Sequence, residues 1–176
     1  MLFRSHCRER FDVVLLQGGT PRTLSAARNH TVEAFASAKS ALNPGGSRST
    51  STGGAASQLS NAAAAAAGAE LQGLRQVFRY LAVSPGLSLS YHASDGSGVV
   101  TGDSSVLAQR LAPRRAAQTV DLGRLEDAYD RRRAEGFLAQ IAAHPVSAAE
   151  DLRHTAHLWA IAGWAEVWHR DRKSVV

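Results

Sequence analysis

The hydrophobic positions of the first forty residues predict a strand followed by a helix. Residues 11–17 (FDVVLLQ) form a short apolar run rich in β-branched side chains, and glycines follow at 18 and 19. This composition is typical of a buried strand. Thr20 and Pro21 then supply a hydroxyl cap and a first-turn proline, so we expect a helix from Pro21 to Leu42.

The stretch at 43–61 (NPGGSRSTSTGGAASQLSN) breaks this pattern. It is dominated by Gly, Ser and Thr and holds few apolar side chains. Such a segment buries too little apolar surface to offset its chain entropy. We interpret it as a flexible linker between an N-terminal segment, residues 6–42, and a mainly helical domain, residues 62–170.

Beyond the linker, the apolar positions predict a helix and a hairpin. Residues 62–83 begin with six alanines and place larger apolar side chains on one helical face. Residues 87–93 alternate apolar and polar side chains, as a half-buried strand does. A Ser/Asp/Gly-rich turn at 94–98 and the apolar residues at 99–101 complete a predicted β-hairpin.

The last third of the chain predicts further helices. Asp103 is placed to cap a helix through Leu111, and Asp121 a helix at 121–143. Ser147 and Glu150 have the spacing of a capping box for a helix at 147–169, which is apolar on two faces. The predicted fold class is mainly α: a bundle-like fragment with one short hairpin and, as an open addition, the leading strand. We expect the core at 121–143 and 147–169, with 62–83 packed on it.

Composition narrows the class of protein. The 176 residues carry a formal charge of +5, almost all of it from arginine, and one cysteine, Cys7. A single cysteine excludes an internal disulfide and a cysteine-based zinc site. No apolar run approaches the roughly 20 residues of a membrane span. We therefore expect a soluble protein without membrane contact, in the cytoplasm, encoded by GC-rich, bacterial-type DNA.

The two ends of the chain resemble translated sequencing-adapter DNA. Met1–Ser5 (MLFRS) is similar to the in-frame translation of one adapter, and Asp171–Val176 (DRKSVV) to that of its complement. Such segments are set aside in fold analysis. The expectation is that residues 6–170 are a piece of a larger protein. A second interpretation, translation of a non-coding frame, stays open because GC-rich DNA favours Ala, Arg, Ser and Gly in every frame.

Several short patterns in the sequence are candidate ligand sites. Glu150, His154 and His157 would share one face of a helix, and Glu166 with His169 would form a Glu-x-x-His pair. Metal-binding bundles need two such pairs and further inward carboxylates, so solvated side chains are expected here. Residues 18–20 lack the spacing of a phosphate loop, and residues 95–98 lack the later ligands of a calcium loop. No catalytic residue, cofactor or metal is predicted.

Two sets of side chains remain as candidate contact surfaces. The first consists of the tryptophans of the final helix, which are common anchors of protein interfaces: Trp159, Trp164 and Trp168. The second is a set of arginines suited to phosphate, although acidic residues interleave with it: Arg110, Arg114, Arg115, Arg131, Arg132 and Arg133.

The function predicted from these surfaces is a non-catalytic interaction or assembly module that binds a protein partner through the tryptophan helix. The alternative is a nucleic-acid-associated domain that uses the arginines. An enzyme fragment whose partner residues lie elsewhere is a third possibility.

Overall fold

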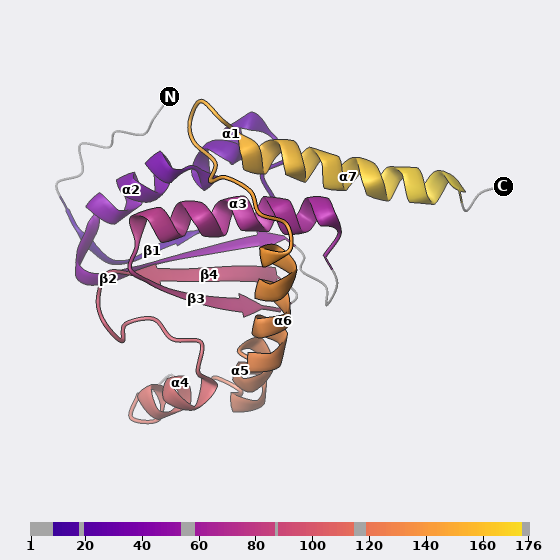
Figure 1. Cartoon of the computed structure of the whole chain (residues 1–176). Coiled ribbons are helices and arrows are strands. Elements are labelled where there is room, and N and C mark those ends of the chain that lie inside the picture. The colour runs from indigo at the N-terminus through magenta and orange to yellow at the C-terminus, as the bar shows by residue number, and fades with distance from the viewer. Residues whose placement is uncertain (1–8, 18–19, 54–58, 87, 115–118, 174–176) are drawn as a thin grey trace.

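A four-stranded sheet organises the chain. The computed structural model describes residues 9–17, 20–53, 59–86, 88–114 and 119–173, with the side chains of 166–173 left out. The strand order is β1-β2-β4-β3, in which β1 is parallel to β2 and the other neighbours are antiparallel (Figure 1). The fold is therefore mixed α/β, and the prediction of a mainly α bundle is wrong.

Strand β1 (Phe11–Leu16) forms where the leading strand was predicted, but it lies at the edge of the sheet and its side chains are exposed or half-buried, so the prediction of a buried strand is wrong. Strand β2 (Leu42–Gly53) comes from the segment interpreted as a flexible linker, so that interpretation is wrong for these residues. It lies between β1 and β4, which satisfy the backbone groups along both of its edges. The side chains of Arg48 and Thr50 are buried. Because these inward-facing side chains are polar, the strand has no alternation of apolar and polar residues in its sequence.

The hairpin joins different residues from those predicted. Strand β4 (Ser88–Ser94) matches the alternating run, but its partner is β3 (Tyr80–Pro85), with Val83 opposite Tyr91. Residues 99–101 form no strand. Helix α3 (Asn61–Val77) ends earlier than predicted, since the backbone is extended from Phe78 onward. The apolar residues at 80–83 fit a helical and a strand pattern equally well, and pairing with β4 selects the strand.

Side-chain caps divide two predicted helices into shorter ones. In place of one helix at 21–42 there are α1 (Leu24–Ala27), the 3-10 turn η1 (Arg28–His30) and α2 (Val32–Ser40), because Thr31 starts a new helix. The hydroxyl of Thr31 accepts a hydrogen bond from the amide of Ala34. The helix predicted at 121–143 is likewise divided, into α5 (Leu122–Ala128) and α6 (Arg131–Ala142).

Two further predictions about helix starts have opposite outcomes. Helix α4 (Ser104–Leu111) begins where expected, and the carboxylate of Asp103 accepts from the amide of Ser105 at 2.9 Å. The capping box at 147–150 does not form. Glu150 and Arg153 instead exchange two backbone hydrogen bonds across a tight turn, and α7 (Thr155–Lys173) begins after it.

Helix α3 is the centre of the core. It covers one face of the sheet, while α2 and α7 lie along its outer side and α6 stands at the end of the strands (Figure 1). The core holds Phe35 from α2, Leu71 and Leu74 from α3, Tyr91 from β4 and Phe137 from α6. It thus joins residues from both sides of the predicted linker, and it is not centred on the last two predicted helices. No helix within the described residues is long and apolar enough to cross a membrane.

Candidate functional site

Helix α7 packs on α3 through a stripe of small side chains. Ala156 and Ala160 are buried, and a Cβ added at Gly163 would lie 3.5 Å from the Cβ of Ala62. Small residues let the two helix axes approach closely. The stripe uses only one side of α7, so its larger apolar side chains must point elsewhere.

Those larger side chains form what we call the α7 outer face: Leu158, Trp159, Ile161 and Trp164. Leu158 is 66% exposed, Trp159 39% and Trp164 47%. At 3.6 residues per turn, Leu158 and Ile161 lie opposite the small-residue stripe, and the two tryptophans lie on its flanks. The predicted interface residues Trp159 and Trp164 are therefore accessible, whereas the side chain of Trp168 lies outside the described residues.

Of the predicted arginines that the structure describes, three are engaged in local contacts. Arg110 on α4 donates to the carbonyl oxygens of Gly98 and Val99, at 2.6 and 3.1 Å, and so closes the turn before α4. Arg114 is exposed. Arg115 lies outside the described residues.

The three arginines that open α6 have different surroundings. Arg131 Nε donates to the carboxylate of Glu135 at 2.7 Å, and Arg133 donates to the carbonyl of Asp127 at 3.1 Å. Arg132 is exposed. Two of the three therefore serve local structure, and one sits directly beside an acidic partner.

The residues weighed as metal ligands are not brought together. Glu150 lies in the turn before α7, and His157 Nδ1 lies 2.8 Å from the carbonyl oxygen of Pro21. His154 Nδ1 is buried without a hydrogen-bond partner among the residues that the structure describes. No group of three potential ligands is found within that part of the chain, and the side chains of Glu166 and His169 lie outside it.

Of the two loops that the sequence offered for ligand binding, only residues 95–98 lie wholly within the described part of the chain. Residues 18–19 lie outside the described residues, and the helix after Thr20 begins only at Leu24. Asp95, in the turn after β4, is paired with Lys39 at 2.5 Å and accepts from the amide of Arg79. The hydrogen bond from Lys39 is the main cause that lowers the pKa of Asp95.

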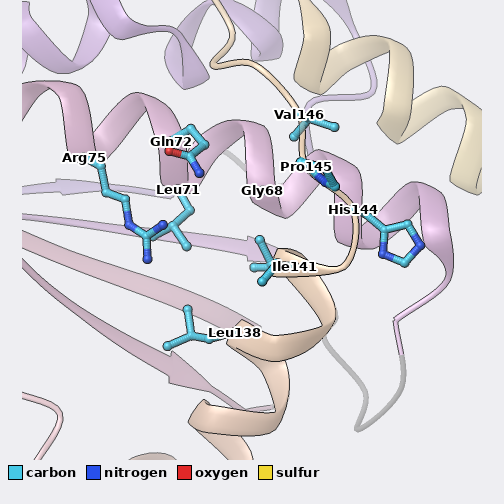
Figure 2. A pocket seen from close by; sticks show the side chains of 10 residues that line it. Gly68, Leu71, Gln72, Arg75, Leu138, Ile141, His144, Pro145 and Val146 are labelled. Atoms are coloured by element: carbon cyan, nitrogen blue, oxygen red, sulfur yellow. The ribbon is translucent and has the colours of Figure 1, made fainter.

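A small pocket lies where α3, α6 and the following loop meet (Figure 2). It encloses about 270 Å³ and is lined mainly by apolar side chains, among them Leu71, Leu138 and Ile141. Gly68 also lines the pocket, and a Cβ added there would come within 3.2 Å of Ile141. His144 Nδ1 is already within 3.1 Å of the carbonyl of Gln140. Gln72 and Arg75 also line the pocket, so an apolar wall is combined with three polar side chains.

A larger groove of about 670 Å³ runs between β3 and the helices α4, α5 and α6. Apolar residues of β3 and α6 form part of it, and four carboxylates with one arginine line the rest. The acidic residues are Asp103, Glu126, Asp130 and Glu135. In the sequence, Glu126, Asp130 and Glu135 interleave with the arginines of the helix predicted at 121–143. Their position beside β3 could not be predicted, because that proximity exists only after the sheet has formed.

A buried polar cluster lies between α3 and the sheet. His30 Nδ1 and Glu70 Oε1 are 3.0 Å apart, and both side chains are almost fully buried. The guanidinium of Arg48 lies over the ring of Phe35, 4.4 Å from its centroid. Burial lowers the pKa of Arg48 to about 10, against the opposing attraction of the Glu70 carboxylate. This cluster balances one positive and one negative charge inside the core.

A second polar group links the opposite face of the sheet to α5. Ser49 Oγ lies 2.8 Å from His92 Nδ1, and the hydroxyl of Tyr129 lies 3.0 Å from His92 Nε2. Burial lowers the pKa of His92 and raises that of Tyr129. A hydroxyl beside an imidazole resembles a nucleophile and base, but here a second hydroxyl occupies the other imidazole nitrogen. The arrangement ties α5 to the sheet.

No protein-family model matches the chain, and a comparison with curated proteins found none similar to it.

Proposed function

We propose that the chain is a protein-binding module that contacts an acidic amphipathic helix of a partner through the α7 outer face. The observation that carries the proposal is the partial exposure of four large apolar side chains on neighbouring turns of α7. Tryptophan is enriched among the residues that dominate interface energetics. The shared core of helices and sheet also supports a genuine coding frame, since local caps and global packing agree.

The size of this surface favours a single helix as the partner segment. The four side chains expose on the order of 400 Å² together, within the range of patches that mark interaction sites. A permanent dimer typically buries well over about 800 Å² on each partner. A helix laid along α7 would cover Leu158 and Ile161, opposite the small-residue stripe, with side chains at the spacing of successive turns.

Charge favours an acidic partner. With the adapter-like end set aside, residues 153–170 contain two arginines, Arg153 and Arg170, and one acidic residue, Glu166. Arg153, at the start of this segment, is exposed. Like charges facing each other across an interface are repulsive, so a basic helix would be disfavoured.

Tryptophan fluorescence offers a selective test, because all three tryptophans of the chain lie in α7. The probe is a synthetic helical peptide with leucine at two positions of each heptad and glutamate elsewhere; the control peptide has lysine in place of glutamate. We expect the emission to shift to shorter wavelength with the glutamate peptide only. Leu158→Asp should abolish the shift.

The matched control is Leu15→Asp, because Leu15 is 73% exposed on β1, outside α7. This variant should keep the shift. Equal shifts with both peptides would contradict the charge argument. A shift that grows with protein concentration alone would mean that a second copy, not a partner helix, covers the face.

A further inference from the structure

The groove beside β3 follows the edge of that strand. Leu81, Ala82 and Val83 all line it. Successive side chains of a strand point to opposite faces, so three consecutive residues can line one groove only where it runs along the strand's edge. The opposite wall is formed by the start of α4 and by α5 and α6.

Among the described residues, β3 is the last strand of the sheet and has β4 as its one neighbour. An edge strand presents a row of unpaired N–H and C=O groups, which can pair with an added strand. The groove follows Leu81 to Val83, roughly 10 Å of edge at about 3.3 Å per residue, whereas Ser84 and Pro85 are buried and Ser84 Oγ donates to the carbonyl of Ala128. An added strand would therefore pair with the first half of β3. The groove therefore lies where backbone hydrogen bonds are available.

The charge of the groove is negative. Asp103, Glu126, Asp130 and Glu135 line it against a single cation, Arg131, whose guanidinium is engaged by Glu135 at 2.7 Å. Hydrogen bonds from Ser105 lower the pKa of Asp103, so that carboxylate is ionised at neutral pH. The charge next to the edge strand thus fits a basic ligand.

We propose that an extended basic segment of a partner protein binds in this groove as an added strand beside β3. Its backbone pairs with the free edge of β3, and alternate lysine or arginine side chains reach the carboxylates of α4, α5 and α6. This mode combines backbone hydrogen bonds for affinity with side-chain contacts for selectivity. The surface is separate from the α7 outer face and selects the opposite charge.

The test uses a fluorescein-labelled hexapeptide, Lys-Val-Lys-Val-Lys-Val, and fluorescence anisotropy with the full chain. We expect saturable binding that Glu126→Lys weakens roughly tenfold, through repulsion of the peptide lysines. The matched control is Asp127→Lys, which makes the same charge change one residue away, outside the groove lining. It should leave the affinity within about twofold, the difference expected for a screened rim charge. Both residues are exposed, so both variants should fold.

A second peptide separates strand addition from simple charge attraction. Methylation of its valine amide nitrogens removes hydrogen-bond donors while keeping every charge, and should abolish binding. Equal binding of the methylated peptide, or equal weakening by the two lysine variants, would overturn the proposal. Tryptophan emission should not change in this experiment, so its outcome is independent of the α7 test.

Discussion

Replacing Glu70 by leucine would leave the guanidinium of Arg48 in the core without its counter-charge. Arg48 is 2% exposed and Glu70 is 3% exposed, so water cannot take the place of the lost partner. The Glu70 carboxylate attracts the Arg48 guanidinium, but the two form no direct ion pair among the described residues, and the near neighbour of Glu70 is His30 at 3.0 Å. The cost of removing Glu70 should therefore lie toward the lower end of the range of about 3–5 kcal/mol for breaking a buried pair. Added apolar contacts of leucine return about 1 kcal/mol. We therefore expect Glu70→Leu to lower the free energy of unfolding by about 2–4 kcal/mol.

The matching variant is Arg48→Met/Glu70→Leu, which removes both charges and keeps side chains of similar size. Replacing both members of a buried pair by apolar residues is often neutral or stabilising. The double variant should thus recover most of the loss that comes from the unpaired guanidinium; His30 loses its neighbour Glu70 in both variants, so that cost is common to the two. With Arg48→Met as the second single variant, the difference between the double variant and the sum of the two single variants measures the coupling of Arg48 and Glu70.

The assay is urea unfolding followed by circular dichroism, with tryptophan emission from α7 as a second probe. Coincident transitions from the two probes would establish two-state behaviour and permit the comparison of free energies. If the effects of the single variants simply add in the double variant, Arg48 and Glu70 do not act as a pair. If Glu70→Leu costs less than about 1 kcal/mol, the guanidinium finds another stabilising contact and the reasoning fails.

Three further predictions concern α3, the sheet and α6. Gly73→Ala should destabilise the protein by about 1–3 kcal/mol, because the new Cβ would lie 2.9 Å from the buried ring of Phe35. Gly136→Ala should stabilise the protein by up to about 1 kcal/mol, because the space around Gly136 is open. The midpoint of urea unfolding measures both effects. Burial lowers the pKa of His92 in the folded protein below the 6.5 of the unfolded chain. As the pH falls from 6.5 to the folded-state pKa, the unfolded chain binds a proton that the folded protein does not, so the free energy of unfolding decreases over that range. Above pH 6.5 this loss is absent. A His92→Asn variant should show a smaller loss of stability on acidification, and an unchanged loss would contradict the assignment. Asp130→Ala should cost about 1 kcal/mol, since it removes the carboxylate that caps α6 at the amide of Arg133, and melting temperature by circular dichroism would detect it.

The candidate surfaces were predictable to different degrees. The accessible Trp159 and Trp164 follow from a helix that is apolar on two faces, of which α3 can cover only one. The groove beside β3 was not predictable, because its carboxylates interleave with arginines in the sequence. Their position opposite the edge strand depends on the division of one predicted helix into α5 and α6. Tyr129 and Asp130 mark that division, but a single capping residue within a helical pattern is a weak signal.

The sequence by itself determined the local elements whose signals are strong. The apolar run at 11–16 is a strand, the alanine-rich segment is a helix, the alternating run at 88–93 is a strand, and Asp103 starts α4. The helix and the Asp103 cap rest on interactions between residues close together in the chain. For the two strands the local pattern predicts an extended backbone, although their hydrogen bonds are made with distant strands.

Tertiary structure decided the rest, and β2 shows the physical reason most clearly. Its Gly, Ser and Thr residues have no apolar pattern, and on their own they would not order. Between β1 and β4 its backbone is paired along both edges. Its one buried charge, on Arg48, faces Glu70 from α3 and the ring of Phe35 from α2. Those partners are distant in sequence, so the central strand of the fold exists only once its neighbours are in place.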